Sequence, residues 1–296
     1  MSALVAESRL TRRFEKLKEK NRAALVAFIT ANDPDPALFR QLLEGLPTAG
    51  ADIIELGMPF SDPMADGPSV QLSSQRALQA GVSIDDVLGA VADMREWEMD
   101  TPVILMGYYN PIYRYGPAEF SEAAANAGVD GVIIVDLPPE EAEELNQHLR
   151  ANNLHMIFLA APTTDETRLP RVLDHASGFV YYVAVKGVTG TKSADVSEVS
   201  ARVAAMRKQT DLPIGVGFGI RTAAQAAEMA RFADAVVVGS AIVDIITDGI
   251  DKDRRPQPGL AARVLDFVKD LANGVQTARL GGDNETSVKT STGAGA

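Results

Sequence analysis

The sequence predicts an α/β fold: a single (β/α)8 TIM barrel with an additional N-terminal helix and a short additional helix after the eighth strand. Short apolar segments alternate eight times with longer amphipathic segments, as in parallel strands joined by helices. The apolar segments lack polar alternation, which is typical of strands buried on both faces. No G-x-G-x-x-G motif follows the first segment, which favours a barrel over an open, doubly wound sheet with the same alternation.

The predicted strands are about four to seven residues long and rich in Val, Ile, Leu, Phe and Tyr. They span 24–30, 52–56, 102–106, 131–135, 155–159, 179–183, 213–216 and 235–238. Their length and composition indicate buried strands rather than buried helices.

The predicted helices lie between these strands, and several begin with a capping residue such as Ser83. They span 36–46, 84–98, 117–127, 139–152, 165–175, 198–209, 222–232 and 259–273. A charged segment of helical pattern, 8–21, precedes the first strand and is expected to cover the N-terminal end of the barrel. Segment 239–246 is expected to form the short helix after the eighth strand.

Length and composition support one large domain. The chain has 296 residues, of which 46% are hydrophobic and 23% are charged, and barrels of about 250 residues commonly form a single domain. We therefore expect a catalytic barrel domain over 1–280. Segment 281–296 consists of small and polar residues and is expected to be a disordered C-terminal tail.

The charge of the chain excludes several classes of function. Its formal net charge is −12, which disfavours nucleic acids and anionic membranes as partners. No apolar run reaches the roughly 18 residues of a membrane span, and the N-terminus lacks the pattern of a secretory signal. A cytoplasmic location is therefore expected.

Cofactor and metal chemistry have little support in the residue types. There is no cysteine, which excludes thiolate nucleophiles and thiolate metal sites. His148, His155 and His175 show no ligand spacing such as H-E-x-x-H. We expect no metal and no cofactor in this chain.

Acidic residues cluster where the second predicted strand ends. Segment 55–68 reads ELGMPFSDPMADGP, so that Glu55 ends a buried strand while Asp62 and Asp66 lie in the following loop. Burial of a carboxylate without a partner is costly and raises its pKa toward the range useful for proton transfer. In a barrel, the loops after the strands form the active site. Glu55 and Asp66 are therefore candidate acid–base residues.

Glycine-rich segments follow the last three predicted strands. They are 185–190, 217–220 and 239–240. Glycine allows backbone amides to approach an anion, and the N-terminus of a helix adds unpaired N–H groups. Since barrels that bind phosphate commonly do so after strands 7 and 8, these segments together indicate a phosphate site, with Ser240 as a further donor.

Several of these motifs occur together in one known family. The motifs are FITANDP at 28–34, ELGMPFSDPMADGP at 55–68, MGYYNP at 106–111, DLP at 136–138, GVTG at 187–190, GFGI at 217–220 and GSAIV at 239–243. With them, the sequence resembles the tryptophan synthase alpha subunit family over roughly residues 10–273. Small departures are Met58, Met64 and Tyr109, and none of them falls on a position that is given a role below.

The resemblance implies a lyase that cleaves indole-3-glycerol phosphate to indole and glyceraldehyde 3-phosphate by a retro-aldol reaction in tryptophan biosynthesis. It implies that Glu55 is the general acid–base at indole C3 and the glycerol hydroxyl, and that Asp66 stabilises positive charge at indole N1. The substrate-binding residues it implies are Phe28, Tyr181, Gly190, Gly219, Gly239 and Ser240.

The resemblance also implies a partner and a lid. The segment 187–197, with Gly187 and Thr189, resembles a mobile lid that excludes water. Asp62 is implied to face a pyridoxal-phosphate-dependent beta subunit, which receives the indole within an alpha2-beta2 heterotetramer. The pyridoxal phosphate (PLP) is expected in the beta subunit only.

Other functions remain open at this point. Lys186 follows the sixth predicted strand and would be the nucleophile of a Schiff-base aldolase, although an exposed loop lysine is the simpler interpretation. A regulatory subunit that binds a phosphorylated ligand would not need Glu55 or Asp66. A lyase that works without a partner and releases free indole is not distinguished by the sequence.

Overall fold

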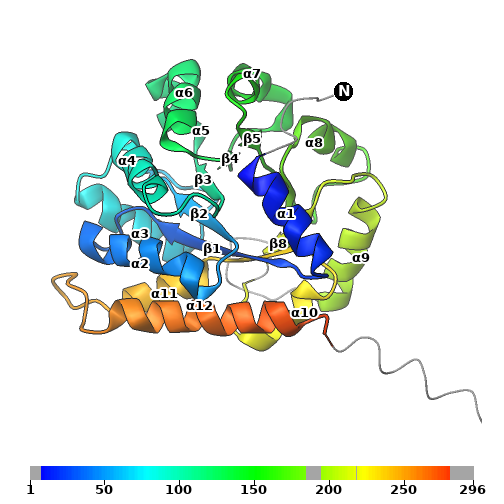
Figure 1. Cartoon of the computed structure of the whole chain (residues 1–296). Helices are drawn as coiled ribbons and strands as arrows, with labels where there is room; N and C mark the ends of the chain where they lie inside the picture. Colours follow the sequence, from blue (N-terminus) through cyan, green and yellow to red (C-terminus); the bar gives the residue numbers. More distant parts are fainter. Residues whose placement is uncertain (1–7, 185–194, 218, 281–296) are drawn as a thin grey trace, which may run out of the picture.

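Parallel strands form a barrel that is surrounded by helices (Figure 1). The computed structural model describes residues 8–184, 195–217 and 219–280. Within these residues the strands are β1 (Ala24–Thr30), β2 (Ile53–Gly57), β3 (Val103–Gly107), β4 (Gly131–Ile134), β5 (His155–Met156), β6 (Phe158–Ala160), β7 (Val180–Val183), β8 (Ile214–Gly217) and β9 (Ala235–Val238). Their order is β5-β4-β3-β2-β1-β9-β8-β7-β6, and every pair is parallel.

The first and last strands of this order, β5 and β6, are adjacent in the sequence. β5 pairs with β4, and β6 pairs with β7. Only Ile157 separates β5 from β6, and its N–H donates to the carbonyl of Val132 on β4 (2.9 Å). The predicted strand 155–159 is therefore two short segments that close the barrel, and the predicted barrel fold is confirmed.

The helices lie outside the strands. Their bounds in the described residues are α1 (Arg9–Glu19), α2 (Pro36–Ala49), α3 (Pro68–Gln79), α4 (Ile84–Arg95), α5 (Tyr109–Tyr115), α6 (Pro117–Ala127), the 3-10 helix η1 (Pro139–Glu141), α7 (Glu143–Ala151), α8 (Leu169–His175), α9 (Val196–Met206), α10 (Ala223–Ala230), α11 (Ser240–Asp248) and α12 (Leu260–Thr277). None of these helices is both long and apolar enough to cross a membrane.

Two layers of apolar side chains fill the fold. The outer layer lies between the strands and the surrounding helices and includes Leu25 and Leu56. The inner layer lies within the barrel and includes Val26, Ile53 and Ile104. Because successive side chains of a strand point to opposite faces, the alternation along each strand divides its residues between these layers.

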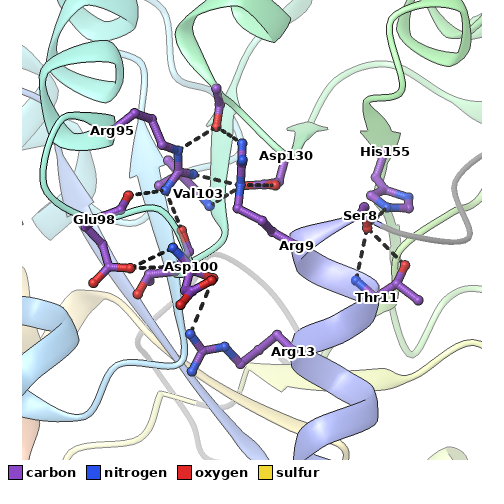
Figure 2. Close-up of polar contacts among 12 residues, drawn as sticks. Ser8, Arg9, Thr11, Arg13, Arg95, Glu98, Asp100, Val103, Asp130 and His155 are labelled. Atoms are coloured by element: carbon purple, nitrogen blue, oxygen red, sulfur yellow. Dashed lines mark hydrogen bonds and ion pairs between the residues drawn. The ribbon is translucent and has the colours of Figure 1, made fainter.

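Helix α1 covers one end of the barrel, as predicted, and Figure 1 looks onto that end. Ser8 caps the helix by accepting a hydrogen bond from the Thr11 N–H (3.0 Å). The apolar face of α1, which includes Phe14, packs on the inner layer of the barrel. The Ser8 hydroxyl also lies 2.8 Å from His155 Nε2, so that the cap contacts the base of β5 (Figure 2).

Carboxylates at the N-terminal end of the barrel are paired with arginines and with backbone. Asp52, just before β2, accepts hydrogen bonds from the Leu25 N–H (2.9 Å) and from Arg22. Asp130 before β4 and Asp234 before β9 each likewise accept the first N–H of the neighbouring strand (2.9 Å) and an arginine. Figure 2 shows the arrangement around Asp130. Each of these charges is thereby compensated.

Two helices were not predicted from the sequence. The buried face of α3 contains Ser73, Ser74 and Arg76, so its apolar periodicity is weak. Its burial is stabilised by polar contacts instead: Arg76 forms a two-point ion pair with Asp33 (2.6 and 2.8 Å). Helix α5 has only seven residues and contains Pro111.

Other predicted helix boundaries also differ. Segment 139–152 divides into η1 and α7, and the helix predicted from residue 165 begins at Leu169. Asp165 instead accepts hydrogen bonds from the N–H groups of Thr167 and Arg168 and forms a turn. The last predicted helix, 259–273, continues to Thr277.

Candidate active site

The candidate site lies at the carboxyl ends of the strands. Glu55 follows Ile53 on β2 by two residues, so its side chain points into the barrel as that of Ile53 does. In the strand register, its neighbours are Phe28 on β1 and Ile104 on β3. A carboxyl group is thus placed among residues that are otherwise apolar.

Among the described residues, no cation compensates the buried carboxyl group of Glu55. Its exposed fraction is 3%, and no hydrogen-bond partner contacts Glu55 Oε2 within the described part of the chain. Burial raises the pKa of Glu55 from 4.5 to about 8, and the charge of Asp66 adds to this effect. The group is therefore protonated at neutral pH and able to donate a proton.

Asp66 is the second buried carboxyl group of the candidate site. It lies in the loop after β2, and its exposed fraction is 7%. Burial raises its pKa to about 6, while a hydrogen bond with Tyr108 opposes this rise. Tyr108 also accepts a hydrogen bond from the Ala65 N–H (3.0 Å), which fixes the loop against the end of β3. Asp66 is therefore mainly ionised at neutral pH.

Two aromatic rings line the same part of the barrel, because glycines leave space for them. A Cβ atom on Gly57 would lie 2.8 Å from the ring of Phe28, and one on Gly217 would lie 2.4 Å from the Tyr181 hydroxyl oxygen. Tyr181 is half-buried on β7, and burial together with the charge of Glu55 raises its pKa well above the usual range. The Tyr181 phenol is therefore close enough to Glu55 for their charges to interact.

A second group of residues lies after β8 and β9. Gly239 immediately precedes α11, and Ser240 is the first residue of that helix. Gly219 has a positive φ of 66° and open space where a side chain would lie, a conformation that favours glycine. These residues could hold an anion. Four residues with predicted or alternative roles lie outside the described residues: Gly187 and Thr189 of the lid, Gly190 of the phosphate site, and Lys186. The tail 281–296 also lies outside them.

Asp62 does not join the buried carboxyl groups. It is exposed and accepts a hydrogen bond from the Ser61 hydroxyl (2.5 Å). Large apolar side chains are exposed in the same loop and on α5, namely Met64 (80%) and Tyr113 (61%). The rim of the barrel beyond β2 and β3 is therefore partly apolar.

Sequence reasoning did not assign roles to Tyr108 and Asp244. Tyr108 belongs to the GYYNP segment, but its contact with the Asp66 loop depends on the pairing of β2 and β3. Asp244 accepts a hydrogen bond from Ser69, which is 175 residues distant in sequence, so no local pattern could indicate it. Among the described residues, no group of three or more His, Asp or Glu side chains is arranged to hold a metal ion.

Comparison with known proteins identifies similar chains. Residues 14–274 match the family model described as tryptophan synthase alpha chain. The chain is 53% identical to a tryptophan synthase alpha chain of Caulobacter sp. (strain K31), over 93% of this chain and 99% of the relative. It is 51% identical to that of Caulobacter vibrioides, over 94% of this chain and 99% of the relative.

Solved structures agree with these relatives. Tryptophan synthase subunit alpha from Legionella pneumophila superposes with a TM-score of 0.83 at 38% identity, covering 92% of this chain and 100% of that one. A chain of Mycobacterium tuberculosis tryptophan synthase superposes with a TM-score of 0.82 at 36% identity, covering 91% and 98%.

Proposed function

The chain belongs to the tryptophan synthase alpha chain family, whose members are lyases, and we propose that it cleaves indole-3-glycerol phosphate to indole and glyceraldehyde 3-phosphate. The observation that carries this proposal is the buried Glu55 carboxyl, which is protonated at neutral pH, beside an ionised Asp66. Two carboxyl groups with separated pKa values suit one proton donor and one anionic stabiliser.

The reaction begins with transfer of the Glu55 proton to indole C3. This transfer places positive charge on the ring nitrogen, and the Asp66 carboxylate accepts a hydrogen bond from N1–H and stabilises that charge. Glu55, now ionised, then removes the proton of the glycerol hydroxyl. The C–C bond breaks, its electron pair restores the neutral indole ring, and the hydroxyl carbon becomes the aldehyde. Each positioned proton transfer contributes roughly 10²–10⁴ in rate.

The remaining residues of the proposed site bind the substrate. Phe28 contacts the indole ring, and Tyr181 lies beside Glu55. Gly219, Gly239 and Ser240 hold the phosphate, together with Gly190, whose role rests on sequence alone. The positive end of the α11 dipole and its unpaired N–H groups favour the phosphate dianion even though the whole chain carries a net charge of −12.

A beta subunit is the partner that the family implies, and we propose an alpha2-beta2 tetramer. The exposed Asp62 and the apolar rim side chains Met64 and Tyr113 support a contact at the mouth of the barrel. The cleavage itself uses side chains of this chain and no cofactor, whereas the PLP belongs to the beta subunit. We further propose that 1–280 acts as one catalytic domain and that the enzyme works in the cytoplasm.

Release of indole by the wild type and by Glu55→Gln, each with and without a beta subunit, tests the proposal. We expect the near-isosteric variant to lose at least ~10² in rate, and the beta subunit to accelerate the wild type. Equal rates for the two proteins would remove Glu55 from the chemistry. Binding of the substrate without cleavage by the wild type would instead support a regulatory binding subunit.

A further inference from the structure

Asp244 connects three elements at the carboxyl end of the barrel. It lies on α11, four residues after Ser240, so the two side chains share one face of the helix and lean toward its N-terminus. Asp244 Oδ1 accepts a hydrogen bond from the Ser69 hydroxyl (2.5 Å), and Asp244 Oδ2 pairs with Arg221 Nη1 (2.8 Å). One carboxylate oxygen therefore binds helix α3, and the other binds the loop after β8.

The hydrogen bond with Ser69 connects Asp244 to the loop that carries Asp66. Ser69 lies in the first turn of α3, three residues after Asp66, and α3 contacts α11. The Gln71 side chain on the same helix donates a hydrogen bond to the Asp66 carbonyl (2.8 Å). The backbone that carries Asp66 is thus fixed to α3, and α3 is fixed to α11 through Asp244.

The ion pair with Arg221 connects Asp244 to the loop after β8, which contains Gly219. Arg221 follows Gly219 by two residues, and its N–H donates to the Gln225 side chain at the start of α10 (2.8 Å). A carboxylate one turn from the N-terminus of α11 would by itself repel a bound phosphate. The guanidinium of Arg221 offsets this charge.

We propose that Asp244 is a positioning residue for the cleavage reaction, which fixes the Asp66 loop relative to the phosphate-binding end of α11. This inference rests on the proposed function. Occupation of the phosphate site would order the N-terminal half of α11, and the Asp244–Ser69 hydrogen bond would transmit that order to Asp66.

Kinetics of five variants, one of them a control, test the connection. Ser69→Ala removes the hydroxyl, and we expect kcat to fall about tenfold with KM unchanged, because a small displacement of a reacting group has a large effect on rate. Ser69→Thr keeps a hydroxyl and should restore kcat. Asp244→Ala should lose at least as much as Ser69→Ala, and the double variant should lose no more than Asp244→Ala, because both changes break the same contact. Asp248→Ala removes an exposed carboxylate from the same helix and is the matched control.

A second measurement does not depend on catalysis. Inorganic phosphate should slow amide hydrogen exchange in segment 58–67 of the wild type, and Ser69→Ala should abolish this protection while binding phosphate with unchanged affinity. Protection that persists in Ser69→Ala, or its absence in the wild type, would overturn the inference. Loss of protection in Ser69→Ala, in a protein whose wild type releases no indole, would refute the proposed function and leave only the connection between the phosphate-binding end of α11 and the Asp66 loop supported.

Discussion

Burial raises the pKa of Glu55, and this predicts that replacement of Glu55 by glutamine stabilises the protein at alkaline pH. Unfolding restores the ordinary pKa of 4.5, whereas the folded protein holds this pKa at about 8. Because the folded state binds the proton more tightly, stability is highest below pH 4.5 and is lost as the pH rises toward 8. Glu55→Gln cannot ionise and does not incur this loss.

The magnitude follows from the two pKa values. Each unit of pKa difference is worth about 1.4 kcal/mol. Ionisation of Glu55 on unfolding therefore lowers the free energy of unfolding of the wild type by roughly 1 kcal/mol at pH 5 and by roughly 4 kcal/mol at pH 8. A buried amide without a full set of partners has its own cost of about 1–3 kcal/mol, but this cost does not depend on pH. Relative to the wild type, Glu55→Gln should therefore gain about 3 kcal/mol between pH 5 and pH 8.

Equilibrium unfolding in urea at the two pH values measures this gain, with circular dichroism and the fluorescence of Trp97, the single tryptophan, as independent signals. Glu228→Gln on α10 is the control, because Glu228 is exposed and its replacement should change stability by less than about 0.5 kcal/mol at either pH. A difference between Glu55→Gln and the wild type that stays the same at pH 5 and pH 8 would refute the raised pKa.

Three further predictions concern the two ends of the barrel. The pH profile of kcat/KM for indole release should rise through about pH 6 as Asp66 ionises and fall above about pH 8 as Glu55 loses its proton; a flat profile between pH 5 and 9 would contradict both assignments. Asp130→Ala should lower the free energy of unfolding by about 3–5 kcal/mol, because it leaves the half-buried Arg9 and Arg95 without their carboxylate. Its kcat should remain near the wild-type value at low temperature, and urea unfolding together with indole release tests both statements. Asp62→Ala should reduce activation by the beta subunit more than isolated cleavage, and equal loss in the two assays would argue against its place at the interface.

The strands were predictable because burial on both faces leaves a strong signal. The bounds of β1 and β9 agree with the predicted 24–30 and 235–238, and β2, β3 and β8 each begin and end one residue later than predicted. The glutamate at position 55 was noticeable for the same reason, since it interrupts an apolar strand. The structure places it with Asp66 among buried residues, while their catalytic roles stay predictions.

Features stabilised by polar contacts between distant segments were not predictable. Helix α3 buries Ser73 and Arg76, and their partners Thr30 and Asp33 lie 43 residues away. A pattern of apolar residues carries no information about such pairs, because a buried serine or arginine reads as a surface residue. Asp244 illustrates the same limit, since only the closed barrel brings it to Ser69.

Asp130 at the N-terminal end of the barrel and Glu55 at its carboxyl end are buried in opposite environments. At the N-terminal end, Asp52 and Asp130 each accept hydrogen bonds from an arginine and a backbone N–H, and at Asp130 these contacts oppose the rise in pKa that burial causes. At the carboxyl end, Glu55 has neither on its unpaired oxygen in the described residues, so the folded protein favours the protonated form. The first arrangement offsets part of the cost of burial, whereas the second weakens the fold at neutral pH and supplies an acid. Addition of a cation beside Glu55 would therefore stabilise the barrel and remove the proton that the cleavage requires.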